Sequence, residues 1–294
     1  MRIDAHAHVV PPAYAAALGP MLPPVPATLD GLRGIMDKYG IDRAILSTGP
    51  PGAPTPEIAS VVNEELAAIV QSEPDTFAAL AAVPLGDADA AVSATTHALD
   101  ELGLDGVLVM SSVRGTYLGD PALEPFFAEL DRRAAYVFLH PGFPPHDLPL
   151  SHPVWLYEFT FETTRALANL IYSGTLERYP NIRLQVAHLG GTAPFIAHRL
   201  ASLATREPNE AKQAPAGALE YLRRLYYDTG LANNAPALAA TLEVTPLEHV
   251  VFGTDWPYLD LPTDTDIAPG LEGLGADRAA VDHENALALV PRWR

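Results

Sequence analysis

Two histidines lie one residue apart near the start of the chain, in the segment RIDAHAHVV at residues 2–10. Alternate side chains of a β-strand point to the same face, so His6 and His8 would project together, about 6–7 Å apart. Two imidazoles at this spacing can bind one metal ion. The competing interpretation is an amphipathic strand with a solvated polar face, and the rest of the chain has to decide between them.

Four further titratable residues lie at the ends of short apolar segments: His140, His188, Asp228 and Asp255. The chain has no cysteine, which excludes disulfides, thiol nucleophiles and thiolate ligands. A metal ion would therefore have to be bound by His, Asp or Glu. So many candidate ligands at strand ends favour the metal interpretation over the amphipathic strand.

The metal shell we expect consists of His6, His8, His140 and Asp255. It would hold one divalent ion, Zn or alternatively Mn, and leave room for water or substrate. His188 would then lie beside the metal as the acid/base group, because an imidazole ordinarily titrates near neutral pH. Asp255 could also relay a proton while it contacts the metal. The sequence leaves open the alternative in which His188 binds the metal and Asp255 is free.

The positions of the lysines indicate whether the site could hold one metal ion or two. The chain has two lysines, Lys38 and Lys212, and neither lies at a predicted strand end. A pair of ions bridged by a modified lysine would need one after the fourth strand, where the sequence reads VLVMSS. We therefore expect a mononuclear site.

The elements that must position these residues alternate along the chain. Eight apolar segments that are typical of buried strands are each followed by a helical pattern or a loop. This order predicts a (β/α)8 barrel in one domain over residues 1–294, with its site at the carboxyl ends of the strands. Extended loops rich in Pro and Gly follow the first strand at 10–27 and the fifth at 141–154. The predicted strands are 2–7, 43–48, 77–83, 105–110, 136–140, 182–188, 224–229 and 249–255.

The charge and the apolar content of the chain exclude some classes of binding partner. The formal net charge of −18 disfavours nucleic acid and anionic membrane surfaces. No apolar run reaches the roughly 18 residues that a membrane span needs. The His6–His8 pair also begins too early to leave room for a signal peptide, so we expect a cytoplasmic protein.

Several blocks of sequence resemble the amidohydrolase superfamily, and more narrowly its metal-dependent nonoxidative decarboxylases. The blocks, in the family's order, are IDAHAHVVPPAY, MDKYGIDRAILS, YLGDPALEPFFAEL, VFLHP, FETTRALANLIYSGTLERYPNIRLQVAHLGGTAPF, RLYYDTG and VFGTDWPY. YLGDP and FETTRA look closer to the 6-methylsalicylate type than to the aminocarboxymuconate-semialdehyde type. The resemblance implies an amidohydrolase barrel with metal ligands at His6, His8, His140 and Asp255, and an acid/base histidine at His188.

The resemblance also bears on the substrate. It implies a homodimer in which Arg199 reaches the substrate carboxylate in the neighbouring subunit, although an ordinary surface arginine is the alternative. The second substrate arginine of the aminocarboxymuconate enzymes has no counterpart, because no arginine lies between Ile3 and Leu32. This departure favours a small, apolar monocarboxylate. Arg114 could supply a replacement contact, and Trp155 and Trp256 could form aromatic walls.

The resemblance implies a carboxy-lyase that acts on a small aromatic or unsaturated acid, most simply a salicylate. The metal would orient the substrate, and protonation of the carbon that bears the carboxylate would precede release of CO2. A hydrolase of a lactone or amide could use the same ligands, with His188 accepting a proton. A non-catalytic metal-binding scaffold is the third interpretation, but it would need neither His188 nor an open coordination position.

Overall fold

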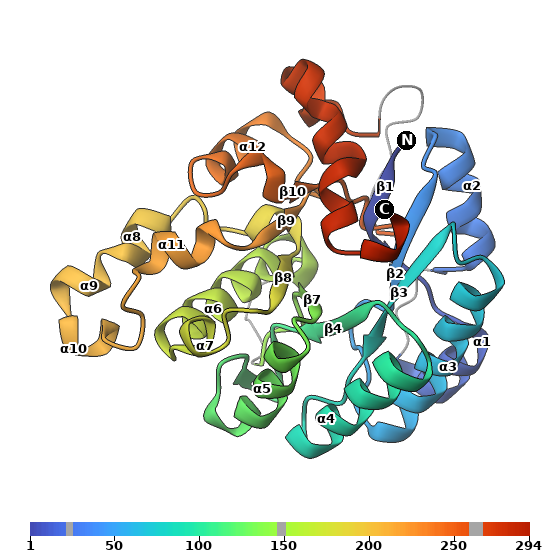
Figure 1. Cartoon of the computed structure of the whole chain (residues 1–294), viewed down its shortest axis with the longest axis horizontal. Coiled ribbons are helices and arrows are strands. Elements are labelled where there is room, and N and C mark those ends of the chain that lie inside the picture. Colours follow the sequence, from blue (N-terminus) through green and yellow to red (C-terminus); the bar gives the residue numbers. More distant parts are fainter. Residues whose placement is uncertain (22–25, 146–150, 259–266) are drawn as a thin grey trace.

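The computed structural model describes residues 1–21, 26–145, 151–258 and 267–294 (Figure 1). Eight parallel strands form one sheet, and each strand pairs with its neighbours along the chain. Helices lie around the outside of this sheet, and their labels surround the strands in Figure 1. In sheet order the strands are β1 (Ile3–His8), β2 (Arg43–Ser47), β3 (Phe77–Ala82), β4 (Gly106–Met110), β7 (Tyr136–His140), β8 (Arg183–Val186), β9 (Tyr226–Asp228) and β10 (Val250–Val251).

The segment after β10 brings the two edges of the sheet together. The amide of Ala5 in β1 donates to the carbonyl of Phe252, and the amide of His8 donates to the carbonyl of Trp256, both at 2.8 Å. In the opposite direction, the amide of Asp255 donates to the carbonyl of His6, also at 2.8 Å. The ring of parallel strands is therefore nearly closed, which confirms the predicted (β/α)8 barrel.

The helices begin where the sequence provides caps. Thr28, Thr55, Asp87 and Asn234 each accept a hydrogen bond from the amide three residues on, which satisfies a free donor at a helix start. The helices are α1 (Pro12–Leu18), α2 (Leu29–Tyr39), α3 (Pro56–Ser72), α4 (Ala88–Thr96), α5 (Glu124–Arg132), α6 (Glu158–Tyr172), α7 (Thr175–Arg178), α8 (Ala197–Ala201), α9 (Leu203–Arg206), α10 (Pro208–Ala211), α11 (Ala218–Arg223) and α12 (Ala235–Leu242). Within the described residues, no helix combines the length and the apolar character that a membrane crossing requires.

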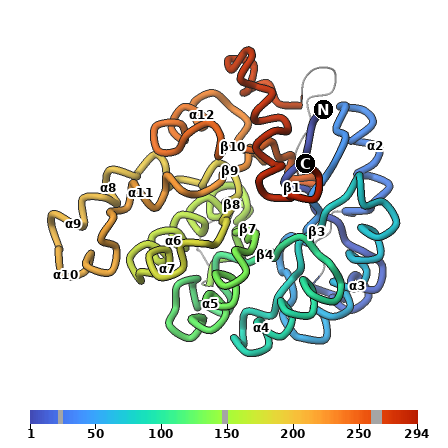
Figure 2. Tube along the Cα trace, in the orientation of Figure 1, coloured from blue at the N-terminus to red at the C-terminus, as the bar shows by residue number. Residues whose placement is uncertain are grey.

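The end of the chain fills one end of the barrel. Leu289, Val290 and Trp293 are buried in a cluster with inward-facing strand residues such as Ile3 and Ile45. Arg43 at the start of β2 donates to the carbonyl of Trp293 at 3.0 Å, and Figure 2 shows the two chain ends near each other. This plug closes the amino-terminal end of the strands, so a ligand can reach the barrel interior from the carboxyl-terminal end.

All eight predicted strands are present, but the sixth and the eighth end early. The predicted segment 182–188 is a strand over Arg183–Val186, and His188 opens a short 3-10 turn (His188–Gly190). The predicted segment 249–255 pairs with β9 at Val250 and Val251 alone. After β8 the backbone turns into positive φ at His188 (57°), which a parallel ladder does not accommodate. The segment after Val251 instead continues in backbone hydrogen bonds with β1 and reaches positive φ at Asp255 (61°).

The connections after the strands also differ in detail from the sequence interpretation. The predicted loop 10–27 contains α1, and its residues 22–25 lie outside the described residues. Residues 146–150 of the predicted loop 141–154 lie outside them as well. An antiparallel hairpin, β5 (Ser112–Val113) and β6 (Thr116–Tyr117), follows β4 and was not predicted, because two-residue strands carry too little periodicity.

Candidate metal centre

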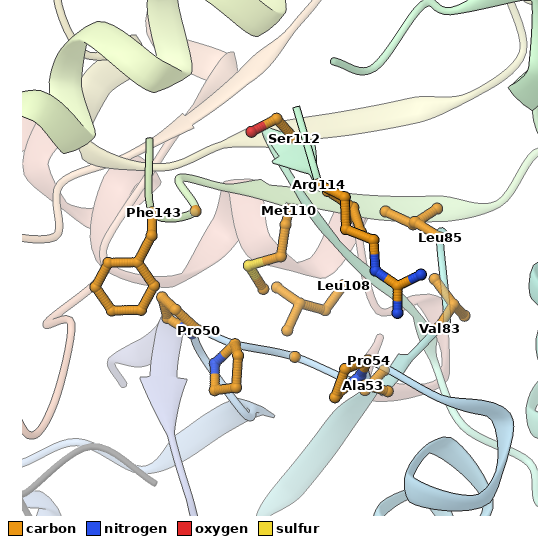
Figure 3. A pocket seen from close by; sticks show the side chains of 15 residues that line it. Pro50, Ala53, Pro54, Val83, Leu85, Leu108, Met110, Ser112, Arg114 and Phe143 are labelled. Atoms are coloured by element: carbon orange, nitrogen blue, oxygen red, sulfur yellow. The ribbon is translucent and has the colours of Figure 1, made fainter. Parts of the chain in front are cut away.

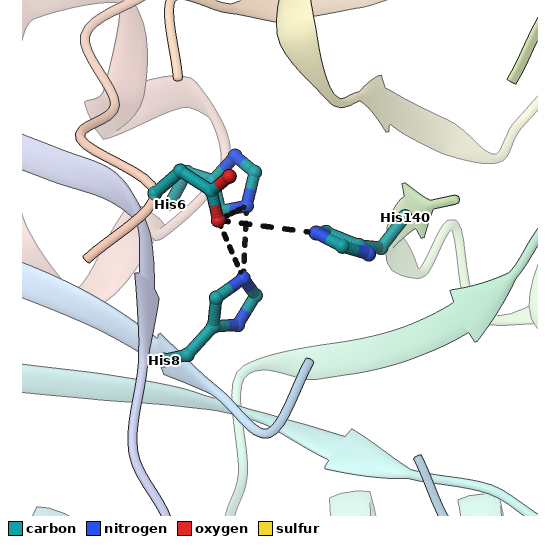
Figure 4. Close-up of side chains that lie close together, drawn as sticks. His6, His8 and His140 are labelled. Atoms are coloured by element: carbon teal, nitrogen blue, oxygen red, sulfur yellow. Dashed lines mark hydrogen bonds and ion pairs between the residues drawn. The ribbon is translucent and has the colours of Figure 1, made fainter. Parts of the chain in front are cut away.

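Three histidines and one aspartate converge at the carboxyl ends of β1, β7 and β10 (Figure 4). The Nε2 atoms of His6 and His8 are 3.1 Å apart. Oδ1 of Asp255 lies 2.9 Å from Nε2 of His8 and 3.1 Å from Nε2 of His6. Nε2 of His140 is 4.0 Å from the same oxygen, and the four ligand atoms all lie within 4.8 Å of one another. The structure thus brings together the four residues that the sequence nominated as ligands.

The outer nitrogen of each imidazole has its own partner. Nδ1 of His6 lies 2.9 Å from Oδ1 of Asp228, and Nδ1 of His8 lies 2.8 Å from Oγ of Ser47. Nδ1 of His140 lies 2.8 Å from the carbonyl oxygen of Pro141. A carbonyl can only accept, so His140 carries its proton on Nδ1. Each of these outer contacts leaves Nε2 as the nitrogen that points to the centre, as in metal-binding histidines.

The residues present fit a divalent ion. Nε2 of His140 is buried and has no hydrogen-bond partner among the described residues, and a metal ion at the centre would satisfy it. All four side chains are nearly inaccessible to solvent, with exposed fractions of 0–3%. Three imidazole nitrogens and one carboxylate oxygen suit Zn or a similar ion of the first transition series.

Electrostatics favour a positive charge at the centre. Burial lowers the pKa of His8 and of His140, so both rings are neutral, the form in which an imidazole binds a metal. Burial also opposes a charge on His6, but the carboxylates of Asp228 and Asp255 outweigh it and raise the pKa of His6 to about 10. Two buried carboxylates therefore face this site, and a bound cation would offset their charge.

His188 lies beside the cluster rather than within it. Its Nε2 is 3.1 Å from Oδ2 of Asp255, the oxygen that faces away from His8. The turn that carries His188 needs glycine, because a Cβ on Gly190 would lie 2.7 Å from the ring of Tyr227. Asp255 therefore offers one oxygen to the cluster and the other to a separate imidazole.

The backbone around Asp255 is fixed by a buried carboxylate. Oδ1 of Asp4 accepts a hydrogen bond from the amide of Thr254 at 3.0 Å, and Oδ2 accepts from the Thr254 hydroxyl at 2.6 Å. Asp4 is fully buried, and this burial raises its pKa to about 6. These bonds tie β1 to the segment after β10, and they support Asp255 in a backbone conformation that is unfavourable for a non-glycine residue.

A cavity of about 210 Å³ lies next to this centre (Figure 3). One wall begins at Pro50, directly after Gly49, whose backbone approaches the ring of His8. Another wall contains Gly142, two residues after His140. Among the described residues the lining is apolar apart from Ser112 and Arg114, and its apolar side chains include Val83, Leu85, Leu108, Met110 and Phe143.

The four predicted substrate-binding residues lie in different places. Arg114 occupies the turn of the β5–β6 hairpin at φ 52°, and its side chain extends across the cavity in Figure 3. Trp155 is 60% exposed, and Arg199 on α8 is exposed as well. The indole of Trp256 packs against Gly31 at the start of α2. Among these four residues, Arg114 alone lines the cavity.

Sequence reasoning missed several neighbours of the centre. Ser47, which bonds His8, lies one residue before the end of the predicted second strand, and that position was the available signal. The ring of Tyr258 lies 5.7 Å from that of His8, and burial raises its pKa to about 12. The ring of Phe159 lies 6.5 Å from that of His140. Gln185 contacts Asp228 from inside the barrel, and nothing in the sequence singled it out.

The sequence profile of the amidohydrolase family matches residues 3–292. The chain belongs to this family. The match extends over almost the whole barrel, and it confirms the superfamily that the motif blocks indicated.

Individual proteins are similar to this chain over nearly its whole length. The 6-methylsalicylic acid decarboxylase of Penicillium expansum is 32% identical over 318 residues, which cover all of this chain and 97% of that protein. A crystal structure of an amidohydrolase II superposes with a TM-score of 0.86 at 28% identity, over 99% of this chain and 100% of that one. The 5-carboxyvanillate decarboxylase of Novosphingobium aromaticivorans DSM 12444, complexed with manganese and 4-hydroxy-3-methoxy-5-nitrobenzoic acid, superposes with a TM-score of 0.84. It shares 20% identity, covers 99% of this chain and 96% of its own, and has the same fold.

Proposed function

We propose that this amidohydrolase is a metal-dependent nonoxidative decarboxylase of a small aromatic acid with a hydroxyl group ortho to the carboxylate. The observation that carries the proposal is the position of His188, an acid/base group next to a candidate metal cluster and outside it. The adjoining apolar cavity supplies a place for an aromatic ring. The similarity to a 6-methylsalicylic acid decarboxylase over the full chain supports the same reaction.

In this proposal His6, His8, His140 and Asp255 hold one divalent ion. We infer Zn from the three imidazole donors, with Mn as the alternative. When bound, the ion would act as a Lewis acid toward the phenolate and carboxylate oxygens of the substrate and would fix their orientation.

A side chain of the protein supplies the proton that replaces the carboxylate on the substrate ring. The His188 imidazolium, hydrogen-bonded through Nε2 to Asp255, donates its proton to the ring carbon that bears the carboxylate. The bond from that carbon to the carboxylate then breaks, its electron pair restores the aromatic ring, and CO2 leaves. His188 is neutral at this point and regains a proton from water. Protonation interrupts aromaticity and is the difficult step, so the placement of His188 matters most.

The cavity limits the substrate to a small molecule. Its volume of about 210 Å³ lies below the roughly 300–1,000 Å³ of common ligand pockets, which favours one ring with small substituents. Apolar side chains would contact the ring edge. The guanidinium of Arg114 would contact an anionic oxygen of the substrate. In this pose Trp155 and Trp256 contribute less than the sequence interpretation assumed, because neither lines the cavity.

We also propose that the chain forms one domain over residues 1–294 and works as a cytoplasmic homodimer in which Arg199 reaches the substrate of the neighbouring subunit. Trp155 and Phe195 are aromatic side chains that are 60% and 82% exposed, and we propose that a second copy of the chain covers them. Arg199 follows Phe195 by four residues and is exposed too. Cell fractionation would test the location.

Product analysis tests the reaction itself. The metal-loaded enzyme would be incubated with salicylate, 6-methylsalicylate and 2,6-dihydroxybenzoate, and in parallel with aryl lactones and amides, in ¹⁸O-water. We expect CO2 and the corresponding phenol from at least one benzoate. Incorporation of ¹⁸O into a lactone or amide product, without release of CO2 from any benzoate, would contradict the proposal and favour the hydrolase.

A further inference from the structure

A buried carboxylate outside the ligand cluster contacts both histidines that carry the proposed chemistry. Asp228 ends β9 and is completely inaccessible to solvent. Its Oδ1 lies 2.9 Å from Nδ1 of His6 and accepts a hydrogen bond from the backbone amide of His188 at 3.2 Å. The amide of Gly230 donates to the same oxygen at 3.0 Å. One oxygen atom therefore bonds a candidate metal ligand and the backbone of the candidate proton donor.

The other oxygen of Asp228 is held from inside the barrel. The side-chain amide of Gln185 donates to Oδ2 at 2.7 Å and to the carbonyl of Ala5 at 3.1 Å. The hydroxyl of Tyr136 donates in turn to Oε1 of Gln185 at 2.5 Å. Tyr136, Gln185 and Asp228 lie on adjacent strands, β7, β8 and β9, and all three are buried.

The direction of these hydrogen bonds fixes the state of His6. Tyr136 donates to the amide oxygen of Gln185, so the amide nitrogen faces Asp228. Both oxygens of Asp228 then act as acceptors, as expected for a buried carboxylate that donors stabilise. His6 must donate through Nδ1, so Nε2 is the nitrogen that faces the centre.

The same carboxylate supports a strained turn. His188 and Leu189 both adopt positive φ, 57° and 50°, which is unfavourable for residues other than glycine. The hydrogen bond from the His188 amide to Asp228 is one of the contacts that hold this turn. Loss of that bond would let the backbone relax, and the imidazole of His188 would move away from Oδ2 of Asp255.

We propose that Asp228 is a positioning residue shared by His6 and His188, so that one buried carboxylate governs both metal affinity and proton delivery. The role of Asp228 in proton delivery through His188 rests on the proposed function. Its role in metal affinity through His6 does not. Gln185 is the outer support of Asp228 in this arrangement.

Asp228→Asn tests the proposal, because it keeps the shape and removes the charge. We expect the dissociation constant for Zn, measured by competition with a chromophoric chelator, to rise about 10- to 100-fold. The visible spectrum of the Co(II)-loaded variant should change, because the ring of His6 would be less firmly oriented. At saturating metal, kcat should stay at least about 10-fold lower while KM changes little, since His188 would still be misplaced.

Two further variants distinguish a role of Asp228 in positioning His6 from a general loss of stability. Gln185→Met leaves Asp228 in place and removes one donor, so it should weaken Zn binding in the same direction but less. Asn63→Ala removes a buried side chain whose two hydrogen bonds go to the backbone of Ala82 and not to the metal cluster. It should lower the melting temperature and leave the Zn affinity unchanged.

The outcomes are distinct. A folded Asp228→Asn protein with the Zn affinity and Co(II) spectrum of the wild type would overturn the metal half. Wild-type kcat at saturating metal would overturn the His188 half. Weakened Zn binding in a chain whose wild type decarboxylates none of the benzoates would support the positioning of His6 and would count against the proposed function alone.

Discussion

Nε2 of His188 lies 3.1 Å from Oδ2 of Asp255, whereas the imidazoles of His6 and His8 face Oδ1 of the same carboxylate. A single side chain thus connects the candidate metal cluster to the candidate proton donor. This division gives the two residues different roles that mutation can separate.

His188→Ala should keep its metal and lose activity by roughly 10²-fold or more, the usual contribution of a positioned proton donor. Asp255→Asn should lose metal first, because the variant replaces the one charged ligand with a neutral amide. Metal content by mass spectrometry and turnover would be measured on both variants. A metal-replete, fully active His188→Ala protein would refute the mechanism, and loss of metal from it would make His188 a ligand.

Replacement of both His6 and His8 by Ala should abolish metal binding, because it removes two of the three converging Nε2 atoms. We expect about one divalent ion per wild-type chain and almost none in the double variant. His97, which lies away from the site at the end of α4, provides a matched control: His97→Ala should retain the metal. Full stoichiometry in the double variant would eliminate the proposed centre.

Arg199 can be tested by subunit complementation. If it acts across a homodimer, Arg199→Ala and His188→Ala proteins should each be inactive, and mixing them should restore activity. The mixed dimer contains one site with an intact His188 from one subunit and an intact Arg199 from the other. Sedimentation would establish the dimer. Failure to recover activity from a confirmed mixed dimer would contradict the role across the interface and leave the metal site unaffected.

Arg114→Gln should raise KM for a carboxylate substrate by about 10-fold or more, because it removes a charged hydrogen-bond donor from the cavity. The metal content should not change, since Arg114 lies on the β5–β6 hairpin and not in the cluster. Arg206→Gln on the exposed end of α9 serves as the control for the lost charge. Equal KM values in both variants and the wild type would remove Arg114 from the substrate site.

Trp293→Ala should lower the free energy of unfolding by about 3–5 kcal/mol, because it leaves a cavity in the plug at the bottom of the barrel. The side chain is 7% exposed, and its indole donates to the carbonyl of Pro74 at 3.1 Å. Leu231→Ala is the control, since that side chain is 51% exposed and should change stability by no more than about 0.5 kcal/mol. Urea unfolding measures both. Equal stability of the two variants would show that the plug contributes little.

The order and spacing of the residues were enough to predict the barrel and to identify the residues that cluster. His6 and His8 share a strand face because of a period of two, and this relationship is local. His140 and Asp255 could be added because parallel strands of a barrel end at one rim, so a position at a strand end implies proximity. The strand predictions succeeded for the same reason, since the buried segments are continuous apolar runs that differ clearly from the amphipathic helices.

The contacts that each atom of those residues makes depend on the three-dimensional packing and could not be predicted from the sequence. The bond between Asp228 and His6 joins residues 222 positions apart, and it depends on side-chain rotamers and backbone turns that no local pattern encodes. The positive φ values of His188 and Asp255, the β5–β6 hairpin and the cavity beneath Arg114 likewise arise from packing between loops. The sequence could identify Asp255 and His188 as residues of one site. It could not predict that one oxygen of Asp255 faces the metal cluster and the other faces His188. That arrangement depends on how β1 packs against the segment after β10.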